Sequence, residues 1–308
     1  MDKKQLTPLI LDIKGNSLDD GPGIRSVIFF KGCPLSCVWC HNPESKKAAA
    51  EISFDASECV ACDTCIKGCL LGALSRKNPF FIDRNRCDLC FICVDNCPSG
   101  ALARVGKKMS IDDIVRQIKK DKPFFKTSGG GVTFSGGEPT MFIDFASELV
   151  KALKAEGIHT LLETCGLFNF DTFSKKILPY LDIIYFDIKL IDPKLHKLHC
   201  GVSNETILEN FIKLNRMSAH GKFKILPRTP LIPDITVTKE NLTGIASFLK
   251  KQGVRDTHLL AYNPLWFDKS KKIGVNCPME KNTDKTTWIP QAKMMEYKSI
   301  YKEYGIQA

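Results

Sequence analysis

The sequence has no long apolar run and no low-complexity segment. None of its 308 residues lies in a stretch of 18 or more consecutive apolar residues, the length that a membrane-spanning helix needs. Its first residues, MDKKQLTPLILDIKG, lack the apolar core and cleavage site of a secretory signal peptide. Hydrophobic residues make up 44% and charged residues 25%, which excludes a disordered chain or a fibre. We therefore expect a globular, cytoplasmic protein without a membrane partner.

A long stretch of like charge is also absent. The 44 Lys and Arg residues exceed the 34 Asp and Glu residues, which gives a formal net charge of +10. The lysines are nevertheless scattered singly or in pairs, whereas a nucleic-acid-binding face gathers its basic residues into a stripe or patch. We expect no nucleic-acid partner.

Cysteine, by contrast, is abundant and clustered. Eleven of the 14 cysteines lie between Cys33 and Cys97 at short, fixed spacings. Because a reducing cytosol disfavours disulfides, this clustering indicates metal ligands. The remaining three, Cys165, Cys200 and Cys277, lie far apart and are interpreted as small buried or surface residues without a ligand role.

Apolar runs rich in β-formers alternate with amphipathic stretches. The runs predict strands at residues 26–31, 132–135, 158–163, 183–190, 223–228 and 258–262, and the amphipathic stretches include 142–154, 204–217 and 238–251. This alternation predicts an α/β fold with a parallel sheet, either doubly wound or a partial barrel. In both architectures the ligand site lies at the carboxyl ends of the strands. We expect Trp266, Trp288 and the phenylalanines to pack in the core, and we assign no role to His159, His196, His199 or His220.

The first cysteine group follows the first predicted strand, as Cys33-x3-Cys37-x2-Cys40. Three thiolates in one loop can ligate three irons of a [4Fe–4S] cluster, and no fourth cysteine lies close by to ligate the last iron. That iron would be open to a substrate, as in catalytic metal sites. The alternative is a structural zinc site with a distant fourth ligand.

The second and third groups form an internal repeat. Residues 59–76 align with residues 87–104 at a constant offset of 28, and both contain the pattern C-x2-C-x2-C-x3-C of two-cluster ferredoxins. In that pattern the fourth cysteine of each run ligates the other cluster. We therefore predict two further [4Fe–4S] clusters, one held by Cys59, Cys62, Cys65 and Cys97 and the other by Cys87, Cys90, Cys93 and Cys69. They would either hold this segment together or relay electrons to the first cluster.

The motifs around the first group resemble those of a known family. The segment GCPLSCVWCHNPES resembles the signature of radical S-adenosylmethionine (SAM) enzymes, and the preceding DDGPGIRSVIFFKG resembles the activating enzymes of glycyl radical enzymes. The resemblance covers nearly the whole chain. It implies a partial (β/α)6 barrel with an inserted ferredoxin-like module: 1–51 as the first part of the barrel with the cluster loop, 52–105 as the insert, and 106–308 as the rest of the barrel.

The resemblance also implies a reaction. The methionine part of SAM would chelate the open iron of the cluster at Cys33, Cys37 and Cys40, which are then the catalytic residues. One-electron cleavage of SAM would give methionine and a 5′-deoxyadenosyl radical. This radical would take a hydrogen atom from a backbone glycine of a partner glycyl radical enzyme and become 5′-deoxyadenosine. A flavodoxin or ferredoxin-type protein would supply the electron.

Further motifs match the SAM contacts of the family. Glycines at a strand end, as at Gly136 and Gly137, allow close backbone approach to a ligand. Asp187 and Lys189 would share one face of a strand, although an ion pair that caps the sheet explains them equally. The resemblance implies that SAM is bound by Trp39, Cys40, His41, Gly136, Gly137, Glu138, Asp187, Ile188, Lys189, Arg228 and Asn263.

Two positions depart from the family pattern. Glu163 stands where relatives often have an Asp that helps to hold a monovalent cation. The resemblance therefore implies a cation near Glu163 and Asp187, although the Glu163 side chain is one methylene longer than Asp. Asn263 stands where relatives carry His, and its amide cannot ionise.

Two other functions are compatible with parts of the sequence. A radical SAM enzyme that acts on a small molecule or another peptide would use the same cluster and SAM motifs. A ferredoxin-type electron carrier would account for residues 59–97 but would leave the three-cysteine loop without a purpose.

Overall fold

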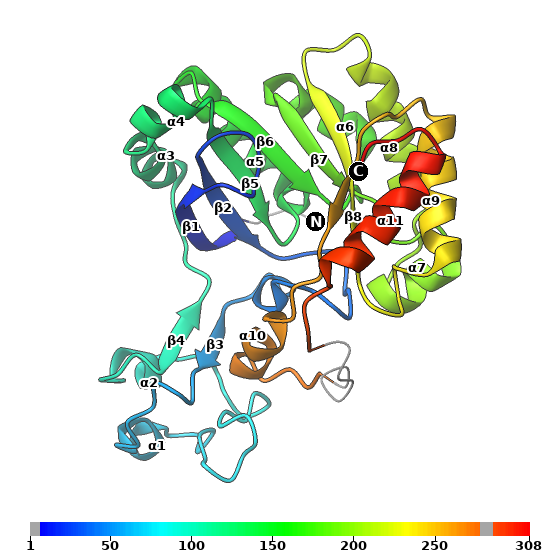
Figure 1. Ribbon diagram of the computed structural model, residues 1–308. Helices are drawn as coiled ribbons and strands as arrows, with labels where there is room; N and C mark the ends of the chain where they lie inside the picture. The colour runs from blue at the N-terminus through cyan, green and yellow to red at the C-terminus, as the bar shows by residue number, and fades with distance from the viewer. Residues whose placement is uncertain (1–6, 278–285) are drawn as a thin grey trace.

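The computed structural model describes residues 7–277 and 286–308 (Figure 1). Its main feature is a seven-stranded sheet with the order β1-β2-β5-β6-β7-β8-β9. The strands are β1 (Leu9–Ser17), β2 (Arg25–Lys31), β5 (Gly131–Gly136), β6 (His159–Thr164), β7 (Ile183–Asp187), β8 (Lys224–Pro230) and β9 (His258–Leu260). Strand β1 is antiparallel to β2, and all later neighbours pair in parallel.

The helices of the barrel connect these strands or follow them. They are α3 (Ile111–Lys119), α4 (Lys122–Ser128), α5 (Ile143–Ala155), α6 (Phe170–Lys176), α7 (Pro193–Cys200), α8 (Glu205–Ser218), α9 (Lys239–Lys251), α10 (Trp266–Lys272) and α11 (Gln291–Glu303). Three short 3-10 turns are η1 (Pro43–Ser45), η2 (Pro139–Phe142) and η3 (Leu178–Tyr180). None of the helices in the described ranges is long and apolar enough to cross a membrane.

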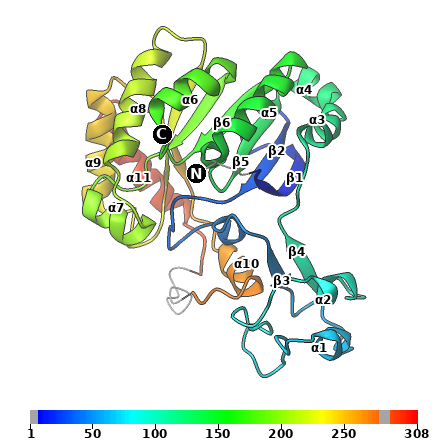
Figure 2. The same ribbon diagram turned by 180° about the vertical axis from the view of Figure 1, so that it is seen from behind.

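The strand order decides between the two architectures that the sequence left open. From β2 to β9 the six parallel strands follow one another in chain order without a reversal. Because crossovers between parallel strands are right-handed, each connecting helix then lies on the same side of the sheet. Figures 1 and 2 show α5, α6, α8 and α9 on this outer side. The fold is therefore a partial barrel, and a doubly wound sheet is excluded.

The predicted elements are present with small differences at their ends. The six predicted strands correspond to β2 and β5–β9, and the three amphipathic stretches correspond to α5, α8 and α9. Strand β7 ends at Asp187 rather than at residue 190. The apolar residues Ile188 and Leu190 extended the predicted strand, but they are buried in the segment that follows it. The sequence does not predict β1, since the charged residues Asp12 and Lys14 interrupt its apolar pattern.

Two hydrophobic regions organise the barrel. The larger one fills the space between the sheet and the outer helices, where Phe186 and Phe211 pack edge to face with ring centroids 5.3 Å apart. The smaller one lies around the cysteine loop and includes Trp39 and Trp266. The expectation that Trp288 packs in the core is wrong, since this side chain is 56% exposed.

The cysteine-rich insert extends away from the barrel (Figures 1 and 2). Its ends are the antiparallel strands β3 (Glu51–Phe54) and β4 (Leu102–Val105), and between them lie the short helices α1 (Thr64–Gly68) and α2 (Ile92–Asp95). The sequence repeat is also a backbone repeat, because positive φ angles recur at the same offset, at Ala61 and Leu89, at Asp63 and Phe91, and at Gly72 and Gly100.

Candidate active site

A cavity of about 290 Å³ opens at the carboxyl ends of the parallel strands. Its wall combines the cysteine loop with the ends of β5, β6, β7 and β8 and with the segment that follows β9. Eleven of the thirteen residues that the sequence predicts for the first cluster and for SAM line it: Cys33, Cys37, Trp39, Cys40, His41, Gly136, Gly137, Asp187, Lys189, Arg228 and Asn263. Residues up to 230 positions apart in the sequence thus face one space.

The glycines at the end of β5 are required by a close backbone approach. Gly136 has φ +99°, and a Cβ atom there would lie 2.5 Å from the backbone nitrogen of Phe30. At Gly137 a Cβ atom would lie 2.1 Å from the carbonyl oxygen of Gly32. The turn after β5 therefore packs directly against the start of the cysteine loop, which no side chain would permit.

The cysteine loop is closed by its own backbone. The amide of Gly32 donates to the carbonyl of Ser45 at 2.7 Å, and the amide of Cys33 donates to the carbonyl of Lys46 at 3.1 Å. Burial raises the pKa of Cys40 to about 12. The neighbouring Cys200 thiol is the main reason that the pKa of Cys37 falls to about 7.

Three thiols from one loop that face one cavity are the donor set that iron–sulfur clusters take, so these residues fit a cluster. Within the described ranges, no three His, Cys, Asp or Glu side chains converge on a point where one metal ion could sit.

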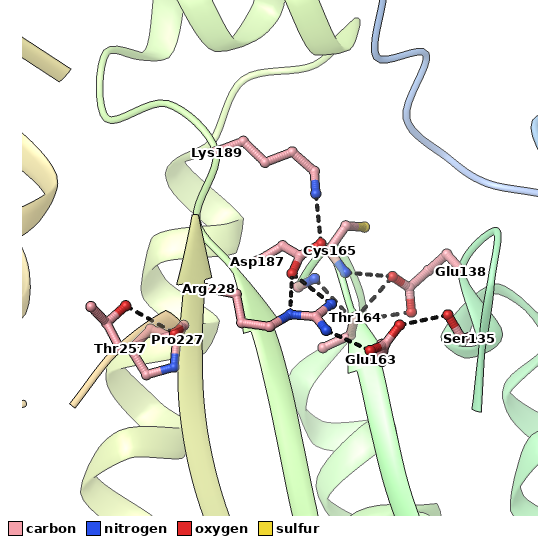
Figure 3. A network of polar contacts seen from close by, with 11 residues as sticks. Ser135, Glu138, Glu163, Thr164, Cys165, Asp187, Lys189, Pro227, Arg228 and Thr257 are labelled. Carbon is pink, nitrogen blue, oxygen red and sulfur yellow. Dashed lines mark hydrogen bonds and ion pairs between the residues drawn. The ribbon is translucent and has the colours of Figure 1, made fainter. Parts of the chain in front are cut away.

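A chain of charged groups crosses the ends of β6, β7 and β8 (Figure 3). Asp187 accepts from Lys189 Nζ at 2.8 Å and from Arg228 Nε at 2.9 Å, and Arg228 also reaches Glu163 at 2.5 Å. Glu163 in turn accepts from the hydroxyl of Ser135 at 2.6 Å. The network places two cations and two carboxylates in the wall of the cavity. The sheet-capping ion pair between Asp187 and Lys189 is thus present, and both residues also face the cavity.

The electrostatics keep this network ionised. Burial alone would raise the pKa of Asp187, but Arg228 and Lys189 hold it below its ordinary value. Burial likewise opposes the charged forms of Lys189 and Arg228, and their carboxylate partners raise the pKa values of both. These three groups therefore stay charged at neutral pH.

Two predicted SAM contacts do not line the cavity. Glu138 is 1% exposed and turns toward β6, where its carboxylate accepts from the amide of Cys165 at 2.7 Å and from the hydroxyls of Thr140 and Thr164 at 2.7 and 3.0 Å (Figure 3). Ile188 is also buried, and its amide donates to the carbonyl of Arg228 at 2.8 Å. Glu138 thus ties the turn after β5 to the end of β6.

The structure adds two cysteines that sequence reasoning left without a role. Cys165 and Cys200 are buried, as predicted, but they lie against the cysteine loop. Cys165 lies beside Cys33 and Cys200 lies beside Cys37, and each neighbour is the main cause that raises the pKa of the buried thiol. No local signal marks either residue, because each lies more than 100 positions from its partner.

Five of the eight cysteines of the insert pack against a very small core, namely Cys65, Cys69, Cys87, Cys93 and Cys97. The buried side chains that form this core are Ile52, Leu74, Phe81, Ile82 and Leu102. Cys97 lies close enough to Cys62 and Cys65 to influence their pKa values, and Cys69 contributes in the same way at Cys93, where burial raises the pKa to about 11. Each fourth cysteine thus lies near at least one cysteine of the other run.

Comparison with known proteins agrees with this fold. The model of the radical SAM superfamily matches residues 79–242, and a model described as a 4Fe-4S single cluster domain matches residues 19–71. A radical SAM methyltransferase from Sphaerobacter thermophilus shares the fold, with a TM-score of 0.54, 11% identity, and coverage of 98% of this chain and 76% of that one. The chain belongs to the radical SAM superfamily.

Similar proteins of known function identify the family within this superfamily. The trans-4-hydroxy-L-proline dehydratase activating enzyme of Clostridioides difficile is 39% identical over 272 residues, which are 87% of this chain and 88% of that protein. The isethionate sulfite-lyase activating enzyme of Desulfovibrio desulfuricans is 37% identical, with 90% and 89% covered. The choline trimethylamine-lyase activating enzyme of Oleidesulfovibrio alaskensis is 36% identical, with 89% of each chain covered. Within the superfamily, the chain belongs to the activating enzymes of glycyl radical enzymes, and it acts by radical SAM activation of a partner enzyme.

Proposed function

We propose that this activating enzyme carries three [4Fe–4S] clusters and uses the cavity at the strand ends to bind SAM. The observation that carries this proposal is the convergence of the three-cysteine loop, the glycine turn after β5 and the charged network on one cavity. The established activity needs these components in one place, because the group that removes the hydrogen atom comes from SAM.

The residues of the cavity have separate roles in this proposal. Cys33, Cys37 and Cys40 would hold the cluster, and Arg228 with its carboxylate partners would orient the carboxylate and ribose of SAM. When bound, the reduced cluster supplies one electron and SAM supplies the group that takes a hydrogen atom from a backbone glycine, with methionine and 5′-deoxyadenosine as products. No side chain has to transfer a proton, so the un-ionisable amide of Asn263 is compatible with the reaction.

The backbone of Gly136 and Gly137 and the ring of Trp39 would complete the SAM site, beside the methionyl amine and the adenine. A monovalent cation near Glu163 and Asp187 belongs to the same proposal. Arg228 already places one positive charge between these carboxylates, so we expect a cation to change SAM affinity only modestly. Equilibrium SAM binding in potassium, sodium and choline buffers tests this point.

We also propose that residues 52–105 are a separate two-cluster module with the ligand sets Cys59, Cys62, Cys65, Cys97 and Cys87, Cys90, Cys93, Cys69. Its core cluster has only five apolar side chains, too few for a domain of this size, which supports clusters that hold it together. A flavodoxin or ferredoxin-type reductant would deliver electrons, and these clusters would relay them to the cluster that binds SAM. The protein would act in the cytoplasm and would not bind nucleic acid. Iron content of about 12 per chain, falling by a third when Cys37 is replaced, tests the cluster count.

The partner is a glycyl radical enzyme whose own substrate the comparisons leave open. The three relatives serve enzymes with different substrates, yet their identities to this chain lie between 36% and 39%. The experiment adds the reconstituted, reduced protein and SAM to anaerobic extract of native cells, followed by brief exposure to air. A glycyl radical should then break one large protein at a single glycine, and the fragment mass identifies the partner.

The Cys37→Ala variant should give no cleaved protein, while a Cys277→Ala variant, altered outside the cluster loop, should match the parent. If SAM is cleaved but no protein is cut in extracts from any growth condition, the partner assignment fails and a small-molecule substrate takes its place.

A further inference from the structure

The end of helix α7 lies directly against the cysteine loop. The amide of Ser36 donates to the carbonyl of Cys200 at 2.9 Å, and the amide of Val38 donates to the carbonyl of His199 at 3.0 Å. These two amides flank Cys37 on either side. The loop therefore takes its backbone acceptors around Cys37 from a segment more than 160 positions further along the chain.

The shape of this helix end depends on a glycine. Gly201 ends α7 with φ +87°, and its amide donates to the carbonyl of Lys197 at 3.0 Å. A Cβ atom at Gly201 would lie 2.2 Å from the hydroxyl oxygen of Ser36. The turn thus packs against the side chain of Ser36, which a side chain at position 201 would have to displace.

Cys200 adds a side-chain contact to the two backbone bonds. The residue is 0% exposed and packs in the same hydrophobic group as Cys37 and Trp39. Its thiol lies beside that of Cys37, which is the main cause that raises the pKa of Cys200 above its ordinary value. The chemistry described above makes no use of this thiol.

We propose that residues 199–201 are a clamp that positions the cysteine loop, and that the Cys200 thiol donates a hydrogen bond to the Cys37 sulfur when that sulfur ligates iron. An iron-bound thiolate has lost its proton and can only accept, so Cys200 must be the donor. Hydrogen bonds to ligand sulfurs tune the reduction potential of iron–sulfur clusters. Because reduction adds negative charge to the cluster, a donor to its sulfur makes the potential less negative. The proposal rests on the assignment of a cluster to Cys33, Cys37 and Cys40.

The test uses the full-length, reconstituted protein with Cys200→Ala and Cys200→Ser. Cys277→Ala is the matched control, since Cys277 packs on the same hydrophobic group but its thiol contacts the carbonyl of Val275 at 3.8 Å. A redox titration followed by electron paramagnetic resonance measures the midpoint potential of the cluster whose spectrum changes on addition of SAM. We expect Cys200→Ala to shift that potential to a more negative value, Cys200→Ser to shift it less because its hydroxyl still donates, and Cys277→Ala to leave it unchanged.

The clusters of the insert provide an internal reference, because their potentials should stay constant in all three variants. A Cys200→Ala protein with the parent's midpoint potential and spectrum would overturn the hydrogen-bond proposal. A parent protein that holds only the insert clusters would instead contradict the proposed function, so the two failures are distinguishable.

A second pair of variants tests the clamp if Cys200→Ala does not accumulate. Gly201→Leu and Gly157→Leu both place a side chain on left-handed backbone, at φ +87° and +70°, but no atom lies within 4 Å of the Cβ position at Gly157. We expect Gly201→Leu to lower the iron content from about 12 to about 8 per chain through loss of the SAM-binding cluster, while Gly157→Leu keeps the full content. Equal iron content in the two variants would overturn the clamp.

Discussion

The ammonium group of Lys31 lies 2.7 Å from the carboxylate of Glu51, and both side chains are almost completely buried. Lys31 is the last residue of β2, directly before the cysteine loop, and Glu51 is the first residue of β3, the strand that leads into the insert. The same ammonium group donates to the carbonyl of Glu44 at 2.6 Å. One buried ion pair thus joins the barrel, the cysteine loop and the insert.

We predict that Lys31→Met destabilises this junction. Removal of Lys31 leaves the buried carboxylate of Glu51 with only the exposed ammonium group of Lys47 as a partner, and loss of the buried partner costs about 3 kcal/mol. Thermal unfolding followed by circular dichroism should show a lower midpoint, and limited proteolysis should cut faster near residues 46–51. Lys47→Met is the matched control, because Lys47 also pairs with Glu51, at 3.2 Å, but is 66% exposed. Its effect should be about 0.5 kcal/mol. Equal effects of the two substitutions would show that burial of the pair is unimportant.

We predict that Glu138 supports the fold rather than contacting SAM. Its carboxylate is fully engaged by Thr140, Thr164 and Cys165 and does not line the cavity. Glu138→Gln replaces an acceptor oxygen by an NH2 group that faces these donors, at a cost of about 2 kcal/mol. We expect a lower unfolding midpoint and SAM affinity within about threefold of the parent.

Glu163→Gln is the comparison for Glu138→Gln, since Glu163 lines the cavity and is expected to affect SAM binding more strongly than folding. If the Glu138→Gln protein has normal stability but no longer binds SAM, the prediction is wrong and Glu138 contacts SAM directly, as the family resemblance implies.

The features that the sequence predicts are encoded by residues close together in the chain, whereas the features that it misses are contacts between distant segments. The six parallel strands and the cysteine groups are encoded locally, by apolar runs and by spacings of two or three residues, so both can be read from the sequence. The contact of Cys200 with Cys37 and the pairing of Lys31 with Glu51 depend on how distant segments pack, and no local pattern marks them. The direction of Glu138 depends on donors at Thr164 and Cys165, and a motif that names the residue does not give its orientation.

Arg228 holds its two carboxylates through separate nitrogens, and a lysine cannot reproduce this arrangement. Nε and one terminal nitrogen bond Asp187, both at 2.9 Å, while the other terminal nitrogen bonds Glu163. Arg228→Lys keeps the charge but supplies a single ammonium group. We expect the Kd for SAM to rise about tenfold, equivalent to about 1.4 kcal/mol, in equilibrium binding to the reconstituted protein. Arg216→Lys, on the exposed face of α8, should bind SAM like the parent, and tight binding by Arg228→Lys would exclude a role for the forked contact.

The pH dependence of SAM binding follows from the charges in the cavity. The pKa of Asp187 is lowered from its ordinary value, so the carboxylate loses its charge only in acid, and the raised pKa values of Lys189 and Arg228 keep both cations charged in mild base. Burial, with a contribution from Lys269, lowers the pKa of His41 to about 4, so this imidazole is neutral above about pH 5. We therefore expect the Kd for SAM to stay constant between about pH 6 and 8.5. A change in affinity centred near pH 6.5 would mean that His41 titrates in contact with solvent, and the His41→Gln variant should then abolish that change.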